Sequence, residues 1–324
     1  MARVLSGTRP TGKLHLGNLL GALENFKKLE GGDSFFMIAD WHALTTEYES
    51  KVSIRQNVME VAMDYLASGL NPAQCTIFVQ SEVPEHAELA LLLGMITPLG
   101  WLERNPTYKE QLREMTGRDL YTYGFLGYPV LQAADILLYK AEKVPVGEDQ
   151  LPHLELTREI ARRFNHLFKP VFPEPQAILT KAPRIPGLDG RKMSKSYGNT
   201  VELSDAPETV DKKIAQMVTD PARKRREDKG RPEVCPVYFY HTLLKNPQVE
   251  KVAHECSNAL RGCVECKQEM AGHLKAFMKP IYEKRKSWES RKKEIEEILA
   301  EGTQRARKIA QATLREAKEA VKIL

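Results

Sequence analysis

The 324-residue sequence has no apolar run of the roughly 18–20 residues that a membrane-spanning helix needs. Its first ten residues also lack the apolar stretch of a secretory signal peptide. These absences argue against a membrane partner and predict a cytoplasmic protein. The composition, 42% hydrophobic and 28% charged, is that of a globular chain with room for about two domains.

Two nucleotide-binding signatures are missing as well. The first glycine-rich turn of the chain contains neither G-x-G-x-x-G nor G-x-x-x-x-G-K-[ST], so a dinucleotide site and a Walker-type phosphate site lose their sequence support. A strong charge of one sign is also missing, because 48 Lys and Arg face 43 Asp and Glu, a formal net charge of +5. This balance permits a nucleic-acid partner without demanding one.

Cysteine is scarce but unevenly distributed. Of the five cysteines, Cys75 stands alone, whereas the other four follow the spacing C-x20-C-x6-C-x2-C: Cys235, Cys256, Cys263 and Cys266. In a cytosolic protein such a group predicts a metal or iron–sulfur site before it predicts disulfides. Zinc and a [4Fe–4S] cluster both accept four thiolates, so the spacing leaves the two open.

The first half of the chain alternates short apolar runs with longer helical patterns. Strands are predicted at 4–6, 35–39, 76–80 and 144–147, and helices at 17–29, 52–68, 86–99, 129–141 and 150–166. Such alternation predicts an α/β fold with a parallel sheet of βαβ units in a domain of residues 1–202. Ligands of such sheets bind at the carboxyl ends of the strands.

From residue 203 onward strand candidates almost vanish. A helix is expected to start at Pro207, with Asp205 as a candidate cap, and residues 281–324 are strongly helical. We therefore predict a mainly helical second domain over residues 203–324, which can include a helix that returns to the sheet.

The first motif with chemical content is the octapeptide TGKLHLGN, residues 11–18. It follows the first strand and opens a helix, so its backbone N–H groups and the helix N-terminus can face a phosphate. His15 can donate a hydrogen bond to an oxygen that gains negative charge, and Gly17 leaves room for a flat base. The alternative is an ordinary strand–helix turn with a buried histidine.

The second motif is KMSKS, residues 192–196, with Gly190 before it and Gly198 after it. Glycines on both sides predict a mobile loop. Its two lysines suit a triphosphate, because their charges can stabilise the leaving pyrophosphate. Alone, such a segment is usually a solvated surface turn. Together with the first motif, the phosphate interpretation is favoured.

The two motifs together carry a family resemblance. Residues 15–18 resemble the "HIGH" signature of class I aminoacyl-tRNA synthetases, and residues 192–196 are their "KMSKS" signature. Residues 133–139 (AADILLY) and 144–150 (VPVGEDQ) resemble bacterial tryptophanyl-tRNA synthetases, as do shorter matches at 6–7, 80–83 and 102–104. The resemblance covers essentially the whole chain. It implies a Rossmann-like catalytic domain and a helical C-terminal domain that recognises the anticodon.

The resemblance also implies the reaction and the ligands. L-Tryptophan and ATP would form tryptophanyl-adenylate and pyrophosphate, with Mg²⁺ accompanying the triphosphate, and tRNA(Trp) would then accept the tryptophan on a homodimeric enzyme. Asp135 would accept the indole N–H, which needs one acceptor in a flat apolar slot. The other residues implied for tryptophan are Gly7, His42, Tyr128, Ile136, Val144, Val146 and Gln150.

The residues implied for ATP are Arg9, Pro10, Thr11, Gly17, Asn18, Gly147, Glu148, Asp149, Ile185, Lys192, Met193, Ser194, Lys195 and Ser196. Those implied for the chemical step are His15, Asn18, Lys192, Ser194 and Lys195. Arg9 departs from the Gln of many bacterial relatives, which leaves its role open, and Lys109 is a further candidate for the phosphates.

A minority of this family carries a similar four-cysteine arrangement that holds [4Fe–4S], so the resemblance favours that cluster over zinc. Three alternatives stay open for the chain as a whole. They are a tyrosyl-tRNA synthetase, a small adenylyl transferase, and an idle paralogue that binds RNA or senses redox state through its cysteines.

Overall fold

The computed structural model describes residues 2–114, 119–179 and 184–324. The chain forms two compact units. The sheet unit consists of Met1–Gly12, Ala22–Ala182 and Arg291–Leu324, and the helical unit of Lys13–Gly21 and Pro183–Ser290. This division by packing differs from the predicted division by function after residue 202, which stays a prediction.

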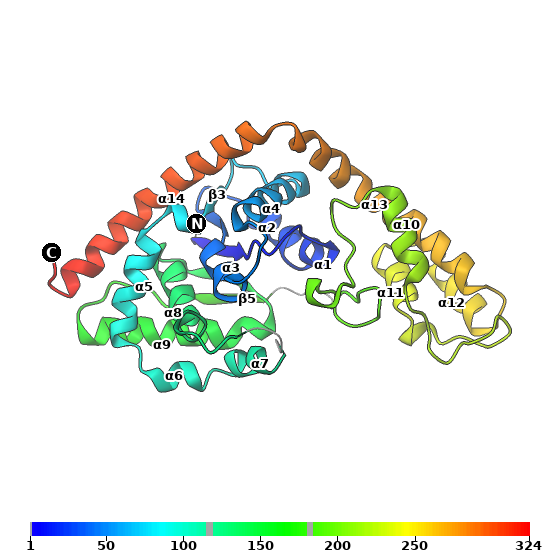
Figure 1. Ribbon diagram of the computed structural model, residues 1–324, viewed down its shortest axis with the longest axis horizontal. Coiled ribbons are helices and arrows are strands. Elements are labelled where there is room, and N and C mark those ends of the chain that lie inside the picture. The colour runs from blue at the N-terminus through cyan, green and yellow to red at the C-terminus, as the bar shows by residue number, and fades with distance from the viewer. Residues whose placement is uncertain (1, 115–118, 180–183) are drawn as a thin grey trace. The chain divides into compact units, whose positions relative to one another are not determined.

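The sheet unit is built on five parallel strands in the order β3-β2-β1-β4-β5 (Figure 1). The strands are β1 Val4–Thr8, β2 Ser34–Ile38, β3 Thr76–Val79, β4 Lys143–Val146 and β5 Gln176–Leu179. Leu5 pairs with Phe35 and Ile38 with Val79, and every residue of β2 and β3 is buried, as their apolar sequences require. The predicted α/β class with a parallel sheet is confirmed.

Helices surround the sheet. They are α2 Glu24–Lys28, α3 Asp40–Glu47, α4 Ile54–Ser68, α5 Glu85–Ile96, α6 Leu99–Glu103, α7 Pro106–Glu114, α8 Tyr123–Leu138, α9 Leu151–Leu167 and α14 Lys292–Ala320. The helix predicted at 17–29 is present as α1 Leu16–Asn18, a π-helical turn at Leu19–Leu23, and α2. Helix α8 starts before the predicted position, because the Thr122 hydroxyl caps it by accepting the Phe125 N–H at 3.2 Å.

The C-terminal helix α14 packs on β3 and α5 within the sheet unit. A Cβ on Gly302 would lie 1.8 Å from the Ile77 carbonyl oxygen, so only glycine allows this approach. Buried alanines at 306, 310 and 317 continue the same close-packed stripe. The structure thus contains the helix returning to the sheet that the sequence analysis allowed for.

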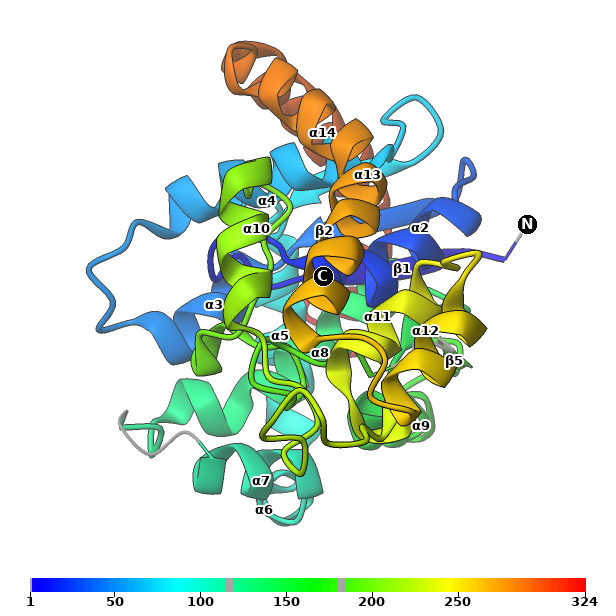
Figure 2. The same cartoon turned by 90° about the vertical axis from the view of Figure 1, so that its right-hand side faces the viewer.

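The helical unit contains α10 Pro207–Gln216, α11 Pro236–Leu243, α12 Val249–Ser257 and α13 Cys263–Glu289. Helices α10 and α11 pack against α13, as Figure 2 shows. Helix α10 does start at Pro207, but its N-cap is Ala206. The Asp205 carboxylate instead accepts the Glu202 N–H at 2.8 Å and pairs with Lys213 at 2.6 Å. Among the described helices, none is long and apolar enough to cross a membrane.

Candidate active site

The strand order places a topological switch between β1 and β4, which are neighbours although a long stretch of chain separates them. Open parallel sheets bind ligands in the crevice at such a point, beyond the carboxyl ends of the strands. Arg9, Pro10 and Thr11 follow β1 directly, and residues 147–149 follow β4. The sheet unit therefore brings these two groups of predicted ATP residues to one edge.

A buried carboxylate lies beside this edge. Asp135 on α8 is 2% exposed and is bonded to two imidazoles, with 2.7 Å from Oδ2 to His42 Nε2 and 2.7 Å from Oδ1 to His86 Nδ1. The Gln80 amide nitrogen donates to both carboxylate oxygens, at 2.8 Å and 3.0 Å. Asp135 is therefore an acceptor at the centre of a polar cluster, and it is not a solvated helix residue.

The protonation state of Asp135 follows from these partners. Burial by itself would raise the pKa of the carboxyl group, but His42, through charge and hydrogen bonding, and His86 outweigh burial and hold the pKa well below its usual range. Asp135 is thus a charged acceptor at neutral pH. A charged acceptor in a buried site binds an N–H donor more strongly than a neutral one does.

Three residues of this cluster had no role in the sequence analysis. Gln80 follows β3, His86 lies on α5, and Tyr139 follows α8. His86 Nε2 lies 2.8 Å from the Tyr139 hydroxyl, and both side chains are fully buried. When His86 donates through Nδ1 to Asp135, its Nε2 accepts from Tyr139. Gln80 and Tyr139 lie within segments that resemble the family, at 80–83 and 133–139, but neither has a predicted role there, and His86 carries no sequence signal.

A second hydrogen-bond chain holds Tyr128. Its hydroxyl lies 3.0 Å from His153 Nε2, and Asn105 Nδ2 lies 3.2 Å from His153 Nδ1. Burial, and then the charge of His42, lower the pKa of His153 to about 4, so this imidazole is neutral at neutral pH. Burial raises the pKa of Tyr128. The rings of Tyr128 and His42 meet edge to face at 6.4 Å, so Tyr128 lies close to the Asp135 cluster.

The remaining predicted tryptophan residues also lie in the sheet unit. Ile136, Val144 and Val146 are buried in its hydrophobic core. A Cβ on Gly7 would lie 3.1 Å from the Met37 carbonyl oxygen, so this position on β1 is tight. Gln150 is half-buried, and its amide donates to Asp149 at 3.1 Å.

Both signature motifs belong to the helical unit. The Leu16 N–H donates to the Val201 carbonyl at 2.9 Å, and His15 forms a β-bridge with Glu202, so the first motif pairs with the segment just after the second. A Cβ on Gly17 would lie 3.0 Å from the His15 ring and 3.6 Å from the Met193 Cβ. Gly17 therefore makes room for both motifs to pack together.

His15 itself is 8% exposed. Burial, and then the charge of Lys195, lower its pKa to about 4, so it is a neutral imidazole at neutral pH. Its Nδ1 atom is buried and has no hydrogen-bond partner among the described residues. Asn18 Oδ1 accepts the His15 backbone N–H at 3.0 Å, which fixes the start of α1.

In the second motif Met193 is buried, Lys192 and Ser196 are exposed, and Ser194 and Lys195 are half-buried. Ile185 accepts the Met193 N–H at 2.9 Å.

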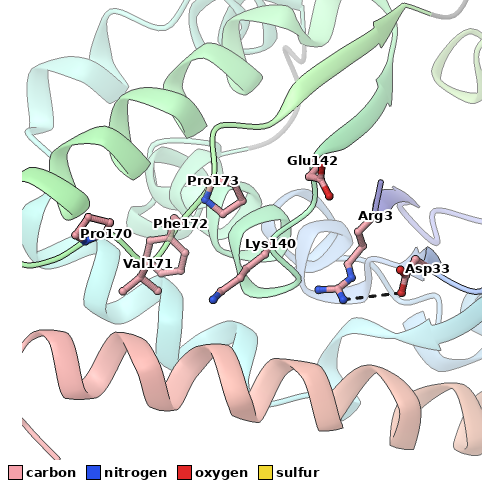
Figure 3. A pocket seen from close by; sticks show the side chains of 8 residues that line it. All are labelled: Arg3, Asp33, Lys140, Glu142, Pro170, Val171, Phe172 and Pro173. Atoms are coloured by element: carbon pink, nitrogen blue, oxygen red, sulfur yellow. Dashed lines mark ion pairs between the residues drawn. The ribbon is translucent and has the colours of Figure 1, made fainter. Parts of the chain in front are cut away.

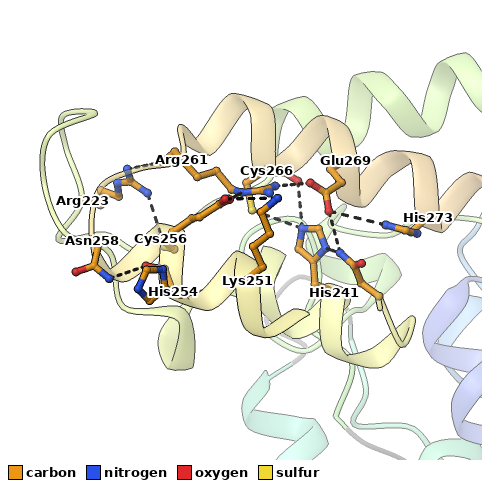
Figure 4. Close-up of polar contacts among 12 residues, drawn as sticks. Arg223, His241, Lys251, His254, Cys256, Asn258, Arg261, Cys266, Glu269 and His273 are labelled. Carbon is orange, nitrogen blue, oxygen red and sulfur yellow. Dashed lines mark hydrogen bonds and ion pairs between the residues drawn. The ribbon is translucent and has the colours of Figure 1, made fainter. Parts of the chain in front are cut away.

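The four clustered cysteines are half-buried free thiols of the helical unit. Figure 4 shows Cys256 and Cys266 with their polar neighbours. Burial raises the pKa of Cys266 to about 12, and the other three thiols add to this rise, so all four are close enough to interact. Arg223 donates to Cys256 Sγ at 3.6 Å, and His241 Nε2 lies 3.5 Å from Cys266 Sγ. Within the described residues, however, no three His, Cys, Asp or Glu side chains converge as a metal site requires.

A surface pocket of about 550 Å³ lies elsewhere on the sheet unit (Figure 3). Arg3, Asp33 and Glu142 immediately precede β1, β2 and β4, so the pocket lies at the amino ends of the strands. It contains none of the predicted site residues. Its other lining residues are Lys140, Pro170, Val171, Phe172 and Pro173.

Comparison with known proteins agrees with the fold and shows the family. Residues 1–279 match the family "tRNA synthetases class I (W and Y)", so the chain belongs to the class I aminoacyl-tRNA synthetases. It is 50% identical to a tryptophan–tRNA ligase of Thermotoga maritima, with 99% of each chain covered, and 47% identical to one of Aquifex aeolicus, with 99% of this chain and 100% of the relative covered. The chain is therefore a member of the tryptophan–tRNA ligase family.

A solved structure shares the whole fold. The tryptophanyl-tRNA synthetase of Campylobacter jejuni, complexed with ADP and tryptophan, matches with a TM-score of 0.88 and 32% identity over 99% of each chain. Membership of this enzyme family excludes the small adenylyl transferase considered above.

Proposed function

We propose that this chain joins L-tryptophan to ATP, forming tryptophanyl-adenylate and pyrophosphate, and then transfers the tryptophan to the terminal ribose hydroxyl of tRNA(Trp). The observation that carries the proposal is the buried, charged Asp135 with its cluster of donors. A site built around a buried acceptor rejects substrates that leave it unpaired.

The Asp135 cluster has one bond that an indole N–H can replace. Gln80 donates from a single nitrogen to both carboxylate oxygens, and the branch to Oδ2 is the longer, at 3.0 Å. An indole N–H can take that position while Gln80 keeps its 2.8 Å bond to Oδ1. Ile136, Val144 and Val146 supply the apolar wall, Gly7 keeps the slot open, and His42 closes it. Tyr128 and Gln150 bind the ammonium group.

The roles proposed for ATP are divided by unit. In the sheet unit, residues 9–11 and 147–149 bind the nucleotide at the switch point, with Lys109 as an additional phosphate contact. In the helical unit, the KMSKS residues bind the triphosphate, Gly17 leaves room for the base, and Ile185 also contacts ATP. His15 and Asn18 stabilise charge on the phosphate oxygens, and Lys192, Ser194 and Lys195 stabilise the departing pyrophosphate. Magnesium bound to the phosphates would supply further charge neutralisation.

Chemistry then requires no covalent enzyme intermediate. The tryptophan carboxylate attacks the α-phosphorus in line, the bond to the β-phosphate oxygen breaks, and pyrophosphate leaves. The side chains orient the reactants and stabilise charge, which are the main sources of rate in such transfers. A neutral His15 suits this role, because it can donate one hydrogen bond without adding a buried charge of its own.

The test is amino-acid-dependent ATP–pyrophosphate exchange on anaerobically purified protein with each of the twenty amino acids. Exchange with tryptophan alone would support both the reaction and the Asp135 assignment. Exchange with tyrosine would retain the class and contradict the pocket. No exchange with any amino acid, in folded protein, would favour the idle RNA-binding paralogue.

We also propose that the enzyme is a cytoplasmic homodimer. The outer face of α5 and the start of α6 expose Leu91, Met95 and Leu99, which are 59%, 73% and 57% exposed. Neighbouring apolar side chains of this size at the surface indicate a protein contact. Light scattering of the wild type and of Leu91→Glu would test the contact. A dimer that persists unchanged in the variant would assign the interface elsewhere.

For the cysteines we propose a [4Fe–4S] cluster, with structural zinc as the alternative. The donor chemistry fits, because Cys235, Cys256, Cys263 and Cys266 are neighbouring free thiols, although their side chains do not converge on one point. Iron, sulfide and zinc analysis of anaerobically purified protein distinguishes the two.

Residues 203–324 would carry anticodon recognition and residues 1–202 catalysis. Cys263→Ser should then weaken tRNA charging more than adenylate formation, and an equal loss of both would contradict a tRNA-specific role.

A further inference from the structure

The side chain of Asn199, just beyond the KMSKS motif, is turned into the motif's own backbone. Asn199 is 2% exposed. Its Oδ1 accepts the Ser194 N–H at 2.8 Å, and its Nδ2 donates to the Lys192 carbonyl at 3.2 Å and to Asp189 Oδ1 at 2.6 Å. One amide group thus holds the peptide units on both sides of the buried Met193.

Other contacts close the loop around this amide. The Leu188 N–H donates to the Asn199 carbonyl at 2.9 Å. Asp189 pairs with the Arg191 guanidinium at 2.6 Å, and that guanidinium lies over the Tyr197 ring at 4.1 Å. These bonds leave Lys192 at the surface of the loop while fixing the backbone from which its side chain extends.

The space for the amide depends on a glycine opposite. A Cβ on Gly187 would lie 2.3 Å from both Cγ and Nδ2 of Asn199. Any side chain at position 187 would therefore displace the amide from its three hydrogen bonds. Gly187 provides a second and independent way to disturb the same feature.

We propose that Asn199 is a positioning residue for amino-acid activation, acting through the backbone of Lys192 and Ser194. The inference rests on the proposed function, in which these two residues stabilise the departing pyrophosphate. Charge stabilisation of this kind depends on donors held in place before the reaction, and a misplacement of about 1 Å can cost on the order of 100-fold in rate.

The proposal separates the two half-reactions. Pyrophosphate is present during adenylate formation and has left before tryptophan is transferred to tRNA. A loop that is misplaced only with respect to the pyrophosphate should therefore slow the first step and spare the second. A purely structural role for Asn199 would lower the amount of folded enzyme and reduce both steps equally.

A matched control exists in the sheet unit. Asn165 also closes a loop with three hydrogen bonds, donating to the Phe172 carbonyl at 2.7 Å and accepting the N–H groups of Val171 and Phe172 at 2.9 Å and 3.1 Å. Asn165→Ala removes the same number of amide hydrogen bonds as Asn199→Ala, with one donated and two accepted instead of two donated and one accepted. It does so away from the predicted site residues.

The experiment compares Asn199→Ala, Gly187→Ala and Asn165→Ala with the wild type. Tryptophan-dependent ATP–pyrophosphate exchange reports the first step, and single-turnover transfer to tRNA from pre-formed tryptophanyl-adenylate reports the second. For Asn199→Ala we expect the kcat of exchange to fall roughly 10- to 100-fold. The KM for tryptophan and the transfer rate should stay within about twofold of wild type. Gly187→Ala should reproduce this pattern, and Asn165→Ala should change neither step.

The outcomes are distinguishable. If Asn199→Ala resembles Asn165→Ala in exchange, or loses transfer as much as exchange, the positioning role is wrong. If Asn199→Ala does not fold, two other variants decide whether the positioning role holds, by the same criteria. One is Gly187→Ala, and the other is Asn199→Asp, which keeps the acceptor and loses both donated bonds. A wild type without tryptophan-dependent exchange would overturn the proposed function itself.

Discussion

Replacing Asp135 by Asn gives the sharpest test of the tryptophan pocket. The amide has nearly the shape of the carboxylate, so packing on α8 should be kept. The change removes the charge and turns one acceptor oxygen into an NH₂ donor. In the native cluster His42, His86 and Gln80 all point donors at the carboxylate. One of these donors, or the incoming indole N–H, must then face another donor.

The magnitude follows from the bond that the substrate loses. A hydrogen bond to a charged group contributes about 1.5–3 kcal/mol, and 1.4 kcal/mol corresponds to a tenfold change. We therefore expect kcat/KM for tryptophan to fall roughly 10- to 150-fold in the pyrophosphate exchange assay. The KM for ATP should change less than about twofold, because no proposed ATP contact is touched.

A suitable control is Asp220→Asn in the helical unit. Asp220 is also buried, and Arg231 holds the pKa of its carboxyl group well below the usual range, with 2.7 Å between Arg231 Nη2 and Asp220 Oδ1. Its replacement should reduce stability without selective loss of tryptophan activation. The reasoning about Asp135 would be refuted if Asp135→Asn kept its kcat/KM for tryptophan, or if the KM for ATP rose to the same extent.

Two further predictions concern stability. The pKa of His153 and that of His15 are both lowered to about 4, against about 6.5 in an unfolded chain, so the unfolded state binds protons between these values that the folded state refuses. The contribution of each histidine to stability should be complete above about pH 6.5 and fall by up to about 1.4 kcal/mol per pH unit as the pH drops toward 4. In urea unfolding, the free energy of unfolding of His153→Gln should therefore depend less steeply on pH than that of the wild type. Gly302→Ala should destabilise the protein by about 3 kcal/mol or more, because the Ile77 backbone cannot yield to the new Cβ. Gly272→Ala on α13, where no atom beyond the adjacent helix backbone lies within 4 Å of the new Cβ, should be neutral or stabilising in the same urea titration. Equal losses in the two variants would contradict the packing argument.

The parts of the fold that the sequence predicted are those with a strong local pattern. The strands before residue 150 are short apolar runs next to turn residues, and all four are confirmed. Strand β5, Gln176–Leu179, escaped prediction because it is an edge strand of four residues, each half-buried or exposed, and so lacks an apolar signature. Helix α3 was also missed, since Asp40–Glu47 mixes charged and apolar residues without a clear period.

The sequence predicted Asp135 but not all of the residues that surround it, for a different reason. Asp135 stood out because a carboxylate within VLQAADILLY needs a partner. Its partners come from α3, from the turn after β3 and from α5, elements brought together only by the order of strands in the sheet. A single sequence indicates that a buried charge must be paired, but it does not indicate which residues are its partners. His86, which bonds Asp135 on one side and Tyr139 on the other, carries no local signal of its own.

The loop with the KMSKS motif shows what a motif omits. Gly190 and Gly198 suggested mobility, yet each has a positive φ, +82° and +62°, and serves a turn within a hydrogen-bonded loop. The residues of the KMSKS signature are those expected to face the ligand. Asn199, the residue that holds their backbone, lies outside the five-residue signature. Two lysines can follow a triphosphate only if their starting points are defined. The chemistry of the motif therefore depends on a neighbour whose side chain faces the protein, and such a residue becomes visible only when the hydrogen bonds of the loop are known.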